Sequence, residues 1–239
     1  MNVINKVVGL TAAVVLSTAA VAAANGGAPR KFTVRIENIT KPNAFKASNG
    51  VKWSLAYSPG LAVVHNATAP IFSAGKKDRG EGLEAQSEDG DPSRLASSLK
   101  SAKGVKSVAV FNTPVGGSKA GPITPGAAYE VTVSAAIGDR LSLTLMMGQS
   151  NDWFYAPEEA GIELFKNGNP ASGDVTGQML LWNAGTEVDQ EPGIGSDQGP
   201  RQKGRNSGKA ENGVVAKIAD GKSYADAPKV LRITITPAP

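Results

Sequence analysis

The chain has 239 residues, with 25 lysines and arginines against 21 aspartates and glutamates, one histidine and no cysteine. These counts exclude disulfides, thiolate zinc sites, cysteine nucleophiles and histidine-rich metal sites. The basic residues are spread along the sequence without interleaved aromatic residues, which argues against a dedicated nucleic-acid surface despite the formal net charge of +4.

Residues 1–24 have the pattern of a secretory signal peptide. Lys6 is the only charged residue among them, and it precedes an apolar stretch, 7–21, that is too short and too rich in Ala, Ser and Thr for a permanent membrane span. Ala22-Ala23-Ala24 fits a small-x-small cleavage site. We predict a cleaved signal of bacterial type and a secreted or periplasmic mature chain, 25–239, that forms one domain without a later membrane span. An uncleaved membrane anchor is the alternative.

Strand patterns follow one another along most of the mature chain. Residues 31–37 alternate apolar and polar side chains strictly, as a half-buried strand does. Looser strand patterns cover 53–57, 61–65, 106–111, 128–135, 140–147, 161–165, 178–182, 213–218 and 230–235. The best helical segment is 82–102, with Leu83, Leu95 and Leu99 as candidate buried positions and breaks at Gly90 and Pro92. About eight to ten strands with one short helical insert predict an all-β fold, an antiparallel β-sandwich.

Two segments about thirty residues apart place a tryptophan beside oxygen donors: 148–154 and 181–192. If strand 161–165 returns after 140–147, and 178–182 comes back again, the loops after 140–147 and 178–182 lie at the same end of the fold. Gly185 lets the backbone curl so that the side chains of Asn183 and Glu187 face one point. The donors on this predicted rim are Asp152, Asn183, Glu187, Asp189 and Glu191.

Oxygen donors held in loops suit a hard cation. Ca²⁺ takes about six to eight oxygens in a flexible geometry, so it fits these scattered donors better than Mg²⁺, which demands a tighter octahedron. Backbone carbonyls and waters complete such a coordination shell. The alternative interpretation is that the acids are solvated loop charges.

Two other patterns have simpler explanations. His65 follows an apolar run, and we expect a packed or hydrogen-bonded structural histidine rather than a catalytic one. Ser87-Glu88-Asp89-Gly90-Asp91 resembles half of an EF-hand loop, but it lacks the downstream bidentate glutamate at the required position. We therefore predict a turn there.

The two tryptophan segments resemble the signature of the spondin N-terminal domain, a family that includes F-spondin, mindin and secreted bacterial proteins. The matching residues are Ser150-x-Asp152-Trp153 and the run Leu-Trp-Asn-Ala-Gly-Thr-Glu at 181–187. Further similarity at 32–40, 57–65 and 82–95 extends the resemblance over nearly the whole mature chain. The family implies an eight-stranded antiparallel β-sandwich, similar to calcium-dependent phospholipid-binding modules, with a divalent cation at one end. The metal ligands that it implies here are Asp152, Asn183 and Glu187.

The sequence departs from the animal members of this family at two of those three positions. Glu187 keeps the negative charge on a longer arm, whereas Asn183 keeps an oxygen and loses the charge. Fewer charged ligands predict weaker Ca²⁺ binding, and Asp189 and Glu191 are the candidates to compensate. The cysteines of the animal domains are also missing from this chain.

These observations predict a secreted or periplasmic Ca²⁺-binding module for adhesion or for recognition of a cell-surface glycan, lipid or protein, and not an enzyme. Two alternatives remain. One is a structural envelope protein without a metal site. The other is a hydrolase in which the bound metal activates water and a neighbouring acid acts as base. A single histidine and the lack of a recognisable nucleophile motif disfavour the hydrolase.

Overall fold

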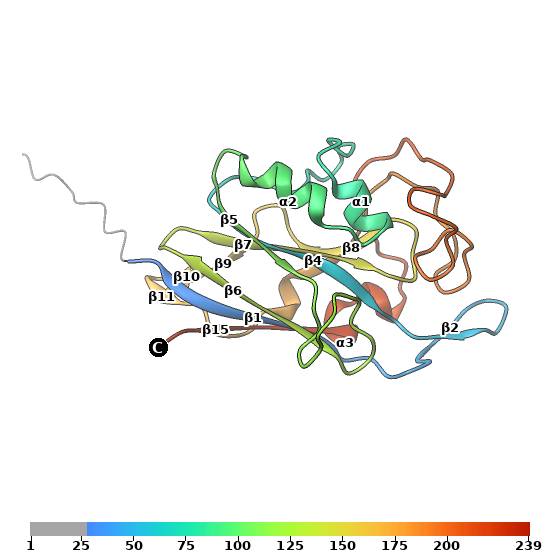
Figure 1. The fold of residues 1–239 in the computed structure, drawn as a ribbon, viewed down its shortest axis with the longest axis horizontal. Helices are drawn as coiled ribbons and strands as arrows, with labels where there is room; N and C mark the ends of the chain where they lie inside the picture. Colours follow the sequence, from blue (N-terminus) through green and yellow to red (C-terminus); the bar gives the residue numbers. More distant parts are fainter. Residues whose placement is uncertain (1–27) are drawn as a thin grey trace, which may run out of the picture.

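The computed structural model describes residues 28–239, in which strands dominate and helices are few and short (Figure 1). The predicted signal peptide, 1–24, lies outside the described residues. Within 28–239, no helix is long and apolar enough to cross a membrane. The prediction of a mostly β, antiparallel fold is confirmed, since the strand pairs of this range run antiparallel.

Two sheets form the body of the protein. The smaller sheet has the order β12-β15-β1-β6, and the larger has the order β14-β13-β8-β7-β4-β5, with β9 paired to the start of β7. The smaller sheet contains β1 (Arg30–Asn38), β6 (Ala128–Ala135), β12 (Gly173–Asp174) and β15 (Leu231–Pro237). The larger contains β4 (Tyr57–His65), β5 (Val105–Phe111), β7 (Arg140–Met147), β8 (Trp153–Pro157), β9 (Ile162–Glu163), β13 (Met179–Asn183) and β14 (Ala216–Lys217). Two short hairpins pair β2 (Phe45–Lys46) with β3 (Lys52–Trp53) and β10 (Phe165–Lys166) with β11 (Asn169–Pro170).

Both sheets contribute side chains to one main core. On β1, Phe32, Val34 and Ile36 are buried and alternate with partly exposed residues, because successive side chains of a strand point to opposite faces. β4 is buried on both faces: alternate residues pack in the main core, while Leu61 and Val63 belong to a second core. The larger sheet is therefore the central layer of the molecule.

Helices α1 (Leu83–Glu88) and α2 (Ser93–Lys100) lie over the larger sheet on the side away from β1 and β15 (Figure 1). Leu83, Leu95 and Leu99 are buried in the second core, as the sequence predicts. The helical segment breaks where Gly90 adopts φ 64° and Pro92 precedes α2, which also agrees with the prediction. A third short helix, α3 (Ala227–Val230), comes just before β15.

Strands β6 and β7 have the bounds predicted from the sequence, but β8 is not predicted. All five residues of β8 are buried, so the strand lacks the alternation that marks a half-buried strand. The strand expected at 161–165 is reduced to the two-residue β9 and the start of β10, and the one expected at 213–218 is reduced to β14. The expected strand at 53–57 is divided between the end of β3 and the start of β4.

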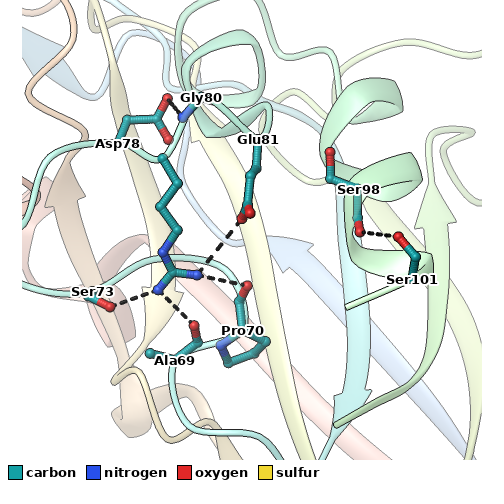
Figure 2. Close-up of polar contacts among 9 residues, drawn as sticks. Ala69, Pro70, Ser73, Asp78, Gly80, Glu81, Ser98 and Ser101 are labelled. Atoms are coloured by element: carbon teal, nitrogen blue, oxygen red, sulfur yellow. Dashed lines mark hydrogen bonds and ion pairs between the residues drawn. The ribbon is translucent and has the colours of Figure 1, made fainter. Parts of the chain in front are cut away.

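The guanidinium group of Arg79 stabilises the segment between β4 and α1. Arg79 donates from Nη2 to the carbonyl oxygen of Ala69 at 2.9 Å and to the hydroxyl of Ser73 at 2.7 Å. Its Nη1 donates to the carbonyl oxygen of Pro70 at 3.4 Å, and Glu81 lies 3.9 Å away (Figure 2). Because the guanidinium is planar and carries several donors, it donates to three acceptors of this loop at once and so fixes the conformation of the chain before α1.

Candidate metal site

The loops after β7 and β13 lie at the same end of the larger sheet, because both strands run antiparallel to β8. Met146 of β7 pairs with Phe154 of β8, and Phe154 pairs in turn with Trp182 of β13. Two reversals of chain direction separate these loops, as the sequence predicts. The strand that runs in the opposite direction between β7 and β13 is β8, however, and not 161–165. The loop that contains Asp152 therefore lies beside the start of the long loop that follows β13.

Asp152 is fully buried, and its two carboxylate oxygens have different surroundings. Oδ2 accepts the backbone N–H of Thr186 at 2.7 Å and that of Glu187 at 3.1 Å, as well as the Thr186 hydroxyl at 3.2 Å. Oδ1 has no hydrogen-bond partner. Gly185 permits this approach, since its φ is 72° and a Cβ there would lie 2.6 Å from the backbone nitrogen of Val214. One buried carboxylate oxygen thus remains available to a ligand.

Glu187 is the second buried acid of this region, with 3 % of its surface exposed. Its Oε1 accepts a hydrogen bond from the side-chain amide of Asn151 at 2.8 Å. Gly208 packs directly against the carboxylate, because a Cβ at that position would lie 1.3 Å from Oε1. The long loop after β13 therefore folds back and covers Glu187.

Asn183, the third ligand implied by the family resemblance, has both polar groups engaged elsewhere. Its Oδ1 accepts the backbone N–H of Gly185, and its Nδ2 donates to Asp189 Oδ2 at 3.0 Å. Asp189 also accepts the indole N–H of Trp153 at 2.5 Å. The other candidate, Glu191, accepts the backbone N–H and the hydroxyl of Ser48. Of the five predicted donors, two acids are therefore buried, whereas each side-chain oxygen of the other three, Asn183, Asp189 and Glu191, is engaged in a hydrogen bond.

Glu88 is an acid that the sequence-based prediction of the site does not include. It is the last residue of α1, it is 2 % exposed, and its Oε2 has no hydrogen-bond partner. The negative charges of Glu84, Glu187 and Asp152 oppose ionisation of this carboxyl group and help to raise its pKa. The only sequence pattern that includes Glu88 is the segment 87–91, which resembles half of an EF-hand loop. That pattern predicts a turn and not a site.

Burial raises the pKa values of all three acids. Burial raises the pKa of Glu88 to about 7, and Glu84, Glu187 and Asp152 add repulsion. Burial raises the pKa of Asp152 to about 6, although the N–H donors of Thr186 and Glu187 limit the rise. Burial also raises the pKa of Glu187. Buried carboxylates are costly without a compensating positive charge.

That compensating charge does not come from an ion pair within residues 28–239, because the seven ion pairs of this range omit Glu88, Asp152 and Glu187. In the same range, no three His, Asp or Glu side chains are already arranged to hold a metal ion. The donor set, carboxylate and backbone oxygens, is suited to a hard cation.

The long loop after β13 is tied to α1 and the turn that follows it. Asp89 accepts hydrogen bonds from the Gln202 side-chain amide at 3.0 Å and from the Asn206 backbone at 3.3 Å. Arg205 forms an ion pair with Asp91 at 2.6 Å. These contacts hold the loop against the helices at the end of the larger sheet where the three acids are buried.

A scan against protein-family models finds no match for this chain, and a search of curated proteins finds no relative. The spondin resemblance thus rests on the sequence motifs at 150–153 and 181–187 and on the weaker similarity around them.

Proposed function

We propose that the protein is a divalent-cation-binding module of the spondin N-terminal type, with Ca²⁺ as its cation. In this proposal the two sheets correspond to a β-sandwich similar to calcium-dependent phospholipid-binding modules. Residues 1–24 direct the chain out of the cytoplasm, and the module recognises a cell-surface glycan, lipid or protein. The proposal includes no catalytic step.

The observation that supports the cation most strongly is the Oδ1 oxygen of Asp152, which is buried and has no hydrogen-bond partner. An ionised carboxylate oxygen in that position lowers stability unless a proton or a cation compensates it. Two backbone N–H groups hold the other oxygen, Oδ2, so the side chain is already oriented. Glu187 adds a second buried carboxylate beside it.

The geometry around His65 does not favour the hydrolase alternative. His65 pairs with Arg140 at the start of β7, whereas the acids lie beyond the other end of that strand. Its two ring nitrogens are occupied by the Ala67 carbonyl and the Ser142 hydroxyl, each at 2.9 Å. The histidine is therefore engaged in the packing of β4 and is separated from the acids by the length of β7.

Calorimetric titration with Ca²⁺ tests the proposal. The wild-type protein is expected to bind, and Asp152→Asn and Glu187→Gln are expected to abolish binding because each removes a charged ligand while keeping the side-chain shape. Asp174→Asn is the matched control, since Asp174 is an exposed acid on β12 in the other sheet. Binding that survives in both site variants would overturn the assignment of these ligands.

Thermal melts separate the proposal from a structural envelope protein without a metal. A ligand that binds only the native state raises the midpoint by mass action. The midpoint is therefore expected to be higher in Ca²⁺ than in EDTA. Equal midpoints at saturating Ca²⁺ would support the structural alternative.

A further inference from the structure

An open cavity of about 510 Å³ lies between the β2–β3 hairpin, the loop after β13 and the chain before α3. Its volume is in the range of small-ligand sites, which combine apolar walls with a few polar groups. Neither Asp152 nor Glu187 lines it. Its lining includes three aromatic residues and three polar ones: Phe45, Trp53, Tyr224, Ser48, Glu191 and Lys222.

Phe45, Trp53 and Tyr224 form an aromatic platform in this cavity. Phe45 stacks on Trp53, with ring centroids 4.5 Å apart and an angle of 22° between the planes, and each of these rings lies 6.0 Å from the ring of Tyr224. Gly193 packs against the indole, because a Cβ at that position would lie 2.2 Å from Trp53 Cδ1. Trp53 is 5 % exposed and therefore supports Phe45, which stays partly exposed.

The polar part of the cavity contains a fixed acceptor. The backbone N–H of Ser48 donates to one carboxylate oxygen of Glu191 at 2.6 Å, and the Ser48 hydroxyl donates to the other. Each oxygen retains a second lone pair, so the oriented carboxylate can still accept hydrogen bonds from a ligand. Lys46 and Lys222 also line the cavity, and neither belongs to the seven ion pairs of residues 28–239. The cavity therefore offers acceptors and donors beside an aromatic surface.

A pyranose sugar has the chemistry that matches this combination. One face of its ring carries apolar C–H groups that pack on an aromatic ring, and the hydroxyl groups around the ring both donate and accept. A small anion would be repelled by Glu191, and a small cation by the two lysines. A neutral ligand with several hydroxyl groups can bond to the carboxylate and to the ammonium groups together.

We propose that this cavity is a carbohydrate-binding site that takes a neutral pyranose residue of a glycan, stacked on Phe45 and hydrogen-bonded to Glu191. The inference rests on the proposed function only in that it narrows the recognised ligand from a glycan, lipid or protein to a glycan. It does not require a bound cation, because the cavity is lined by neither of the buried acids Asp152 and Glu187.

Saturation-transfer-difference NMR in EDTA tests the proposal on protein expressed from the full chain. The probes are the methyl pyranosides of β-D-glucose, β-D-galactose and N-acetyl-β-D-glucosamine at millimolar concentration. Sorbitol is the matched ligand control, because it has similar hydroxyl groups but no pyranose ring. We expect saturation of the ring C–H protons of at least one pyranoside and none of sorbitol. No signal from any pyranoside, or an equal signal from sorbitol, would overturn the proposal.

Two variants test the contacts. Glu191→Gln is expected to weaken binding of the pyranoside by about tenfold, the effect of losing one hydrogen bond to a charged group. Phe45→Leu keeps an apolar side chain without a flat face and is expected to abolish the saturation transfer. Val51→Ala is the control, since Val51 is exposed on the same hairpin and does not line the cavity.

Thermal melts show whether each variant folds. The Glu191 side chain is exposed, so Glu191→Gln gives a valid test even if Phe45→Leu does not fold. Wild-type affinity in Glu191→Gln, or in folded Phe45→Leu, would overturn the assignment of the site. The same result follows if Val51→Ala weakens binding as much as the two cavity variants do.

The sugar and the cation are tested apart. Pyranoside binding in EDTA supports this inference even if the protein does not bind Ca²⁺. Ca²⁺ binding without any pyranoside signal refutes it and leaves the cation site standing. Saturation transfer that appears only in Ca²⁺ would indicate that the cation holds the sugar, and it would overturn the assignment to this cavity.

Discussion

The side-chain amide of Asn183 donates a hydrogen bond to Asp189 Oδ2 at 3.0 Å, while the Asn183 oxygen accepts the backbone N–H of Gly185. An aspartate at position 183 would accept the same N–H but would place a second negative charge against Asp189. The neutral amide of Asn183 is therefore better suited than a carboxylate to a position beside Asp189.

We predict that Asn183→Asp lowers the free energy of unfolding by about 0.5–1.5 kcal/mol in EDTA, because a hydrogen bond is replaced by like-charge contact. Urea unfolding at low ionic strength measures the change. In the Asp189→Asn background the penalty is expected to disappear, since the repelling partner is gone. A penalty of equal size in both backgrounds would show that the Asn183–Asp189 pair is not its cause.

Gly208 is predicted to tolerate no side chain. Gly208→Ala would place a Cβ 1.3 Å from Glu187 Oε1, and that carboxylate is buried and held by Asn151, so it has little freedom to move. We expect a loss of about 1–3 kcal/mol of unfolding free energy, the usual cost of overpacking. Gly204→Ala is the control, because Gly204 belongs to the same loop and a Cβ there would meet no atom within 4 Å. Equal unfolding free energies for the two variants would contradict the close packing over Glu187.

His65 is predicted to make stability depend on pH. Burial lowers the pKa of His65 below its ordinary value of 6.5, so the unfolded chain takes up this proton at a higher pH than the native protein does. The contribution of His65 is therefore fully present above the unfolded pKa, and it decreases as the pH falls toward the native value.

The variant His65→Gln isolates this effect, because it keeps an amide donor and acceptor but does not titrate. Its free energy of unfolding is expected to improve relative to the wild type as the pH falls from about 7.5 to about 5. The buried acids titrate in both proteins, so their contribution cancels in the comparison. Parallel stability curves over this range would exclude a native pKa below that of the unfolded chain.

Whether a strand can be identified from the sequence depends on whether one or both of its faces are buried. The strict alternation of 31–37 identifies β1, since a strand with one buried face has a periodic signature. β8 has no such signature, because both of its faces are covered and all five of its residues are buried. The sequence nevertheless predicts the loop of Asp152 beside the loop of Glu187, because that conclusion depends on two chain reversals and not on which residues make the return strand.

The sequence by itself determines the antiparallel, mostly β class and singles out Asp152 and Glu187, because alternation, turn residues and short motifs are local properties. Only the tertiary structure decides which oxygens remain unpartnered. Glu88 is buried because α1 packs over the larger sheet, and Asn183 bonds to Asp189 because the loop after β13 curls at Gly185. Side-chain hydrogen bonding and burial depend on residues distant in the sequence, so no local pattern distinguishes the buried Glu88 from the partly exposed acids Glu84 and Asp89.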